Sequence, residues 1–171
     1  MMKERTMQRV ENFFADHDDL LFMKNDILNA CNIILDTYKK GGKLLVCGNG
    51  GSCADSDHIV GELMKGFLLK RPLDSVYKDK FREHFGKEGS EVAEKLQGSL
   101  PAISLTAHNA LSTAYANDVD AMLIYAQQVM GYADKDDIVM GISTSGNAKN
   151  VYYALMAAKV KGAKSIALTG R

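Results

Sequence analysis

The residues best suited to chemistry lie between Lys43 and Glu62, in the segment KLLVCGNGGSCADSDHIVGE. An apolar run that ends at Cys47 is followed by Gly48-Asn49-Gly50-Gly51, then by Ser52 and a pattern typical of a helix. Free backbone N–H groups in the first turn of a helix, together with the helix dipole, attract anions. Glycine lets the backbone approach a ligand because it has no Cβ. The segment therefore predicts a strand, a turn and a helix N-terminus that bind an anion.

Two kinds of nucleotide loop do not fit this turn. Cys53 stands where the third glycine of a dinucleotide fingerprint belongs, and no Gly-Lys-Ser/Thr of a Walker A loop occurs. We therefore expect no nucleotide cofactor. Ser52 has the position of an N-cap or of a hydroxyl that contacts phosphate. A plain connection between strand and helix is the alternative, and the run of glycines before an acid-rich helix favours a ligand.

A second turn, Ser143-Thr144-Ser145-Gly146-Asn147, also follows an apolar run and precedes a helical pattern. Three hydroxyls and the N–H groups of a helix could hold a phosphomonoester without a lysine. Ser and Thr are also common N-caps, so these residues could instead serve only the helix. A run of three with glycine behind it favours phosphate binding.

His58 and Glu62 are four residues apart and so share one helix face. Beside a phosphosugar they could act as a general base with its partner, or as two ligands of a metal ion. Two ligands do not complete a zinc site. The plain alternative is an exposed pair that contributes a few tenths of a kcal/mol. Farther along, Asn117-Asp118 closes a predicted helix, and an aspartate in such a loop can also hold sugar hydroxyls.

Alternating elements must position these residues. Apolar runs predict strands, and three-to-four-residue spacing predicts helices. We expect strands at 44–47, 101–105, 137–142 and 164–169, and helices at 4–17, 20–40, about 52–66, 109–117, 119–131 and 148–161. Residues 74–100 break this rhythm and predict two short amphipathic helices around Gly86 and Gly89. The order favours an α/β fold in which a parallel sheet lies between helices, a three-layer sandwich of the flavodoxin-like or Rossmann-like type. Ligands bind beyond the carboxyl ends of such strands, where both turns fall.

Length and composition exclude several classes of protein. A chain of 171 residues predicts one domain with a sizeable core. Lys and Arg number 21, as do Asp and Glu, so no basic field indicates a nucleic-acid partner or a membrane surface. No apolar stretch has transmembrane length, and the first residues are too charged for a signal peptide. Three cysteines without CxxC spacing suggest reduced thiols in a cytoplasm.

Three segments, CGNGGSCADSDHIVGEL, ANDVD and GISTSGNAKNV, resemble the sugar isomerase (SIS) domain family. Within it they resemble phosphoheptose isomerases, a group related to the DnaA-initiator-associating protein. The resemblance spans most of the chain, as a single domain over 1–171. It implies a five-stranded parallel sheet between helices, N-terminal helices used in assembly, and a homotetramer with its sites at subunit interfaces.

The resemblance also implies residue roles. It implies that substrate is contacted by Asn49, Gly50, Gly51, Ser52, Asn117 and Asp118, and that its phosphate is held by Ser143, Thr144 and Ser145. Glu62 would move a proton between C1 and C2. His58 and Glu62 would be two zinc ligands in the zinc-binding members. The implied reaction in carbohydrate metabolism converts sedoheptulose 7-phosphate to a heptose 7-phosphate through an enediol.

Three departures bear on that expectation. Ala148 replaces a serine of the family's STSGNS motif, and residues 74–100 are an insertion that could reshape the mouth of the site. The chain ends at Arg171, before the strand and the helix with a glutamine and a histidine that complete the family's metal site. Either the sequence is truncated, or this member binds phosphosugars without the usual chemistry. The second interpretation gives the alternative function, a phosphosugar-binding regulatory or protein-interaction module without catalysis.

Overall fold

The computed structural model describes residues 4–170 and divides them into two compact units with the boundary between Asp36 and Thr37. The first unit holds α1 (Glu4–Asp16), a 3-10 turn η1 (Asp18–Met23) and most of α2 (Lys24–Lys39). Within it, Phe14 is buried and lies under the Lys24 ammonium, which also bonds Glu11 at 3.2 Å. The two helices predicted near the N-terminus are therefore confirmed, the second beginning with a 3-10 turn.

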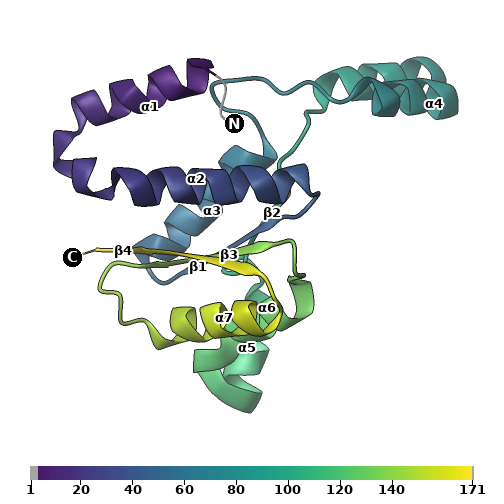
Figure 1. The fold of residues 1–171 in the computed structure, drawn as a ribbon. Coiled ribbons are helices and arrows are strands. Elements are labelled where there is room, and N and C mark those ends of the chain that lie inside the picture. The colour runs from purple at the N-terminus through teal and green to yellow at the C-terminus, as the bar shows by residue number, and fades with distance from the viewer. Residues whose placement is uncertain (1–3, 171) are drawn as a thin grey trace. The chain divides into compact units, whose positions relative to one another are not determined.

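The second unit contains a four-stranded parallel sheet in the order β2-β1-β3-β4 (Figure 1). Its strands are β1 (Leu44–Gly48), β2 (Ala102–Ser104), β3 (Ile138–Ser143) and β4 (Lys164–Thr169). Leu44 pairs with both Ala102 and Ile138, which aligns β2, β1 and β3. The four predicted strands are confirmed within about two residues. Since all strands run in the same direction, their carboxyl ends meet at one edge.

Helices cover both faces of the central strands, as expected for a parallel sheet. Figure 1 shows α3 (Gly51–Met64) on one side and α6 (Ile124–Tyr132) with α7 (Lys149–Val160) on the other. Leu45, Cys47 and Val139 form the core with α6 and α7. The alternate residues of β1 and β3 are also buried, except Met140, which is half-buried, so both faces of these two strands are largely covered. No helix among residues 4–170 is long and apolar enough to cross a membrane.

The outer strand β4 differs from this pattern. Every residue of β4 is exposed except Ile166, which is half-buried. The expectation of a sheet covered on both faces therefore holds for β1 and β3 and fails for β4. The resemblance also implies five strands, whereas residues 4–170 form four.

The segment between β2 and α6 is more irregular than predicted. Helix α5 (Asn109–Tyr115) passes into a π-helical turn η2 (Ala116–Asp120) and a 3-10 turn η3 (Ala121–Leu123). Asn117 and Asp118 thus lie inside the π turn and not at a helix end. The residue that caps the following turn is Asp120, whose carboxylate accepts from the N–H of Met122 at 2.7 Å.

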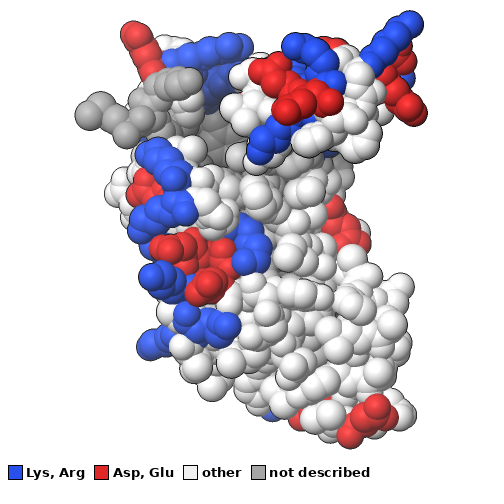
Figure 2. All heavy atoms as spheres, turned by 90° about the vertical axis from the view of Figure 1, so that its right-hand side faces the viewer, with Lys and Arg blue, Asp and Glu red and all other residues white. Residues whose placement is uncertain are grey.

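The insertion forms α4 (Ser75–Lys95), which is two helical segments joined at Gly86. Gly86 has φ +58°, a conformation that favours glycine, so the break lies there and not also at Gly89. Gly89 instead allows close packing, because the Phe81 carbonyl lies where a Cβ would project. Lys78 and Glu94 bond across the two segments at 2.9 Å. Acidic and basic side chains intermix over α4 in Figure 2, with no field of one sign.

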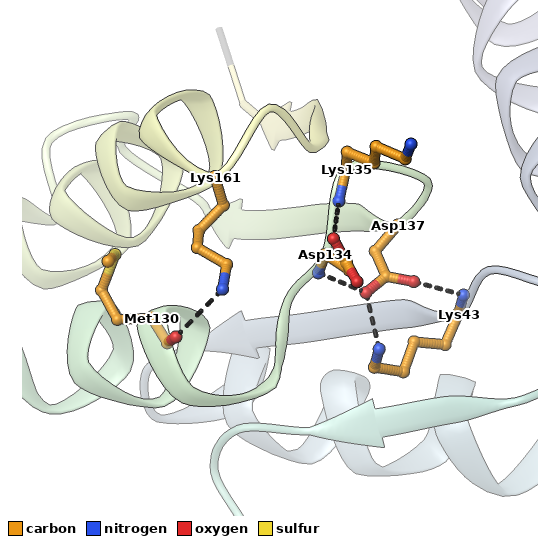
Figure 3. Close-up of polar contacts among 6 residues, drawn as sticks. All are labelled: Lys43, Met130, Asp134, Lys135, Asp137 and Lys161. Atoms are coloured by element: carbon orange, nitrogen blue, oxygen red, sulfur yellow. Dashed lines mark hydrogen bonds and ion pairs between the residues drawn. The ribbon is translucent and has the colours of Figure 1, made fainter.

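The amino ends of β1 and β3 are joined by a buried carboxylate (Figure 3). Asp137 is 3% exposed and accepts from the backbone N–H of Lys43 at 2.8 Å and from its ammonium at 2.6 Å. It also accepts from the N–H of Asp134 at 2.7 Å. Because a buried carboxylate is costly unless it is paired, these three donors make this end of the sheet specific for aspartate.

Replacing Asp137 with alanine should therefore lower the free energy of unfolding by about 2–4 kcal/mol, since two backbone donors and one ammonium lose their acceptor. Urea unfolding followed by circular dichroism measures the change. The control is Asp79→Ala on α4, which removes an exposed ion pair with Arg82 and should cost about 1 kcal/mol or less. Equal losses in the two variants would contradict a special role for Asp137.

Candidate active site

The first predicted turn lies where β1 ends at the carboxyl edge. Gly50 is the N-cap of α3 and has φ +57°, which a side chain would strain. The sequence allowed Ser52 to be the N-cap, but the N-cap is Gly50. Ser52 is the second residue of the helix and is buried. Gly48 also has a steric reason to be glycine, because an added Cβ would lie 2.6 Å from the Ser52 carbonyl oxygen.

The second turn lies beside the first, because β3 is the neighbour of β1. The N-cap of α7 is Ala148, and it makes no side-chain cap bond. None of the three hydroxyl residues, Ser143, Thr144 and Ser145, is therefore the N-cap of α7. Ser143 Oγ does accept from the Ala148 N–H at 3.4 Å. Gly146 has φ +70°, which lets the turn fold back so that its N–H bonds the Ser143 carbonyl.

A cavity of about 290 Å³ lies between the two turns. Its wall is formed by polar side chains of both turns and by two apolar residues: Asn49, Ser52, Ile142, Ser143, Thr144, Ser145 and Ala148. The first N–H groups of a helix have no partner within that helix. Both α3 and α7 begin at this cavity. In α3 the N–H groups of Ser52 and Cys53 bond the carbonyls of Asn49 and Gly50, so the donors for an anion are chiefly the hydroxyls and the N–H groups that begin α7.

A reciprocal pair of amides holds the two turns together. Asn49 Nδ2 donates to Asn150 Oδ1 at 2.8 Å, and Asn150 Nδ2 donates back to Asn49 Oδ1 at 2.9 Å. The hydroxyl of Tyr125, from α6, donates to the Gly48 carbonyl at 2.7 Å and lies 3.3 Å from Asn49 Oδ1. Burial first, and then the neighbouring groups Cys47, Cys53 and Asp57, raise the pKa of Tyr125 to about 12. The hydroxyl therefore stays protonated and keeps donating.

His58 and Glu62 lie on an open face of α3. Their Nε2 and Oε1 atoms are 3.9 Å apart, and the side chains are 79% and 41% exposed. Neither lines the cavity between the turns. Glu62 follows Ser52 by ten residues, about 15 Å along a helix axis. In residues 4–170 no group of three or more His, Cys, Asp or Glu is placed to hold a metal ion.

Asn117 and Asp118 also stand outside the cavity lining within the described chain. Both are exposed, and Asn117 Nδ2 donates to Asp118 Oδ1 at 2.8 Å. Of the residues predicted to bind substrate, the structure thus brings together Asn49, Ser52 and the hydroxyls of 143–145, with Gly50 and Gly51 at the start of α3.

A further polar cluster lies where β2 ends. Asp57 Oδ1, on α3, accepts from Ser104 Oγ at 2.5 Å and from Thr106 Oγ1 at 2.7 Å. These bonds, that from Ser104 first, lower the pKa of Asp57, while desolvation opposes them. Asp57 is therefore a carboxylate at neutral pH.

Comparison with known proteins identifies the family. The SIS domain model matches residues 22–170. The chain belongs to the SIS domain family. It is 36% identical over 168 residues to the phosphoheptose isomerase of Thermodesulfovibrio yellowstonii, covering 98% of this chain and 68% of that protein. It is 39% identical over 145 residues to the phosphoheptose isomerase of Citrifermentans bemidjiense, covering 85% of this chain and 62% of that protein.

Solved structures agree with that assignment. This SIS domain superposes on the phosphoheptose isomerase of Neisseria gonorrhoeae with a TM-score of 0.68 and 28% identity, over 97% of this chain and 76% of that one. For the enzyme of Francisella tularensis the TM-score is 0.66 at 28% identity, over 99% and 77%. The predicted fold class is thereby confirmed. The chain spans about two thirds of the length of the curated relatives that it matches.

Sequence reasoning missed three residues of this SIS domain that fix the site: Tyr125, Asn150 and Asp57. Each acts through a partner distant in the sequence, at separations of 77, 101 and 47 residues. Only Asn150 had a local signal, since it lies three residues after the second turn, at the start of the helix that follows. A polar residue on the first turn of a helix that starts at a ligand site merits such attention.

Replacing Asn150 with aspartate should weaken the binding of inorganic phosphate at least about tenfold, because the variant places a negative charge at an anion site and cannot donate to Asn49. Isothermal titration calorimetry measures the affinity. Tyr152→Phe, on the exposed side of the same helix, is the control and should bind as the wild type does. Unchanged affinity in Asn150→Asp would show that the amide pair does not shape the site.

Proposed function

We propose that this protein is a phosphoheptose isomerase that interconverts sedoheptulose 7-phosphate and an aldoheptose 7-phosphate. The observation that supports it best is the cavity shared by two helix N-termini and the hydroxyls of 143–145. The relatives named phosphoheptose isomerase support the choice of reaction.

The phosphate would lie in the cavity, with Ser143, Thr144 and Ser145 donating hydroxyl protons to its oxygens. The N–H groups that begin α7 and α3 would complete its hydrogen bonds. Asn49 and Ser52 would contact the adjoining part of the substrate, and Gly50 and Gly51 would let it approach the backbone. Fixing one end of the chain in this way lowers the entropic part of the barrier.

In the proposed reaction the Glu62 carboxylate removes a proton from C1 of the ketose. The C–H electrons form a C1–C2 double bond, and the C2 carbonyl oxygen takes up a proton to give an enediol. Return of the proton to C2, with loss of the O1 proton, gives the aldehyde. The cavity lining contains no titratable side chain, so the group that serves the oxygens lies outside it. Asn117 and Asp118 would contact the sugar hydroxyls.

Zinc does not fit the residues that the structure describes. A zinc site needs about four ligands, and His58 with Glu62 supplies two. Since no third His, Cys, Asp or Glu joins them within residues 4–170, no step of the proposed reaction passes through a metal ion.

The distance between cavity and base supports a homo-oligomer as part of the proposal. Glu62 lies about 15 Å along α3 from Ser52, and its side chain is open to another molecule. In the proposed assembly, a dimer or tetramer, Glu62 acts on substrate held in the cavity of a neighbouring copy. The partners of the protein are then a phosphosugar and further copies of itself.

The isomerase proposal predicts the effect of Glu62→Gln. With sedoheptulose 7-phosphate, kcat should fall at least about a hundredfold while KM changes little, because the amide cannot accept the proton but leaves the phosphate site intact. Glu91→Gln on α4 is the matched control and should keep full activity.

Equal turnover in the wild type and Glu62→Gln would contradict Glu62 as the base. A wild type that binds the phosphosugar without converting it would contradict the enzyme and favour the regulatory module. The exposed His58–Glu62 pair is the observation that favours this second function.

The shared-site proposal predicts complementation. At a substrate concentration below the wild-type KM, Glu62→Gln and Asn150→Asp should each have low activity alone, because one lacks the base and the other binds the phosphate at least about tenfold more weakly. Mixed and allowed to exchange subunits, they should regain a measurable fraction of the wild-type rate, since a hybrid pairs an intact cavity with an intact base. No recovery in a mixture shown by native mass spectrometry to contain hybrids would place both groups in one chain.

A further inference from the structure

We propose that Asp57, Ser104 and Thr106 form a second subsite, at the end of β2, that binds the hydroxyls at the unphosphorylated end of a long-chain sugar phosphate. This inference rests on the proposed function for the position of the phosphate. The chemistry of the three side chains, the order of the strands and the backbone on the β4 side of the cavity support it.

The cluster offers acceptors and few donors. The hydroxyl protons of Ser104 and Thr106 are used within the cluster, because both hydroxyls lie within hydrogen-bond distance of Asp57 Oδ1 and their oxygens are 2.7 Å apart. Asp57 Oδ2 accepts no hydrogen bond within the described residues, and Thr106 Oγ1 keeps a lone pair. Asp57 is an exposed residue, so a ligand can reach it. A ligand that fits must bring donors, as sugar hydroxyls do, and a second phosphate would be repelled.

The order of the strands gives the direction in which the ligand would extend from the cavity and the distance that it must span. The cavity belongs to the ends of β1 and β3, and β2 is the next strand beyond β1. Neighbouring strands are about 4.8 Å apart, so the end of β2 lies roughly 10 Å from the end of β3. Asp57 follows Ser52 by five residues, about 7.5 Å along α3. Asp57 also contributes to the raised pKa of Tyr125, whose hydroxyl bonds the Gly48 carbonyl in the turn between the two places.

The backbone around the cavity limits where the rest of the sugar can extend. The volume of the cavity, 290 Å³, falls at the lower end of small-molecule sites, about 300–1,000 Å³. On the β4 side the Thr144 carbonyl accepts from the N–H of Gly170, so backbone occupies that direction. The remaining carbons therefore extend across β1 toward β2.

The test compares ligands that can and cannot span the two places. Isothermal titration calorimetry is carried out with sedoheptulose 7-phosphate, glycerol 3-phosphate and sedoheptulose 1,7-bisphosphate on wild type, Asp57→Asn and Asp79→Asn. In Asp57→Asn, the heptulose should bind about tenfold more weakly and glycerol 3-phosphate within about twofold of wild type. The bisphosphate should gain affinity, because the charge that repels its second phosphate is removed. Asp79→Asn should match the wild type.

Thr106→Val provides a second variant, which removes one hydroxyl and keeps the shape of the side chain. It should weaken the heptulose and leave glycerol 3-phosphate unchanged. Equal losses for both ligands in Asp57→Asn, or no loss for the heptulose, would overturn the subsite. A wild type that binds glycerol 3-phosphate and the heptulose equally would overturn it too, with the phosphate site intact. Failure of the wild type to bind either ligand would instead contradict the proposed function.

Discussion

The pairing of β1 with β3 is the constraint on which the rest of this structure depends. It runs in parallel from Leu44–Ile138 to Gly48–Ile142, through residues buried from both faces. Asp137 bonds Lys43 at the amino end, and Asn49 bonds Asn150 beyond the carboxyl end. A shift of one residue would turn every side chain to the opposite face and separate both polar pairs. One register therefore fixes the core and the cavity together.

The site that this register creates carries no formal charge. None of the residues that line the cavity is ionisable, and the chain as a whole has no net charge. In the proposed function, its attraction for an anion would come from the backbone N–H groups of α3 and α7 and from hydroxyls, which are effective only in a fixed geometry. This explains why Tyr125 and the two amides hold the turns so closely. A site of mobile lysines would not need them.

The strands and both turns could be predicted because their causes are local. A short apolar run beside glycines leaves few alternatives to a buried strand and a turn, and the four runs lie within about two residues of the observed strands. The hydrogen bonds of Tyr125 and Asn150 could not be predicted, because they depend on which strands become neighbours. The π turn that holds Asn117 and Asp118 also escaped prediction, since its sequence continues a normal helical pattern. The exposure of β4 depends on what covers it, which its apolar residues do not reveal.

The sequence suggests that the insertion reshapes the mouth of the site. In the structure, residues near its two ends bond the carboxyl end of α3, whereas the cavity lies at the amino end. Arg71 donates to the carbonyls of Glu62 and Leu63, and Ser99 Oγ donates to that of Met64 at 2.7 Å. A guanidinium at the last carbonyls satisfies their hydrogen bonds and complements the helix dipole. Within the described chain, Arg71 and Ser99 therefore stabilise the carboxyl end of α3 and the turn that carries Glu62. The amino end of this helix is held separately, by the amide pair at the cavity. A change at one end need not disturb the other.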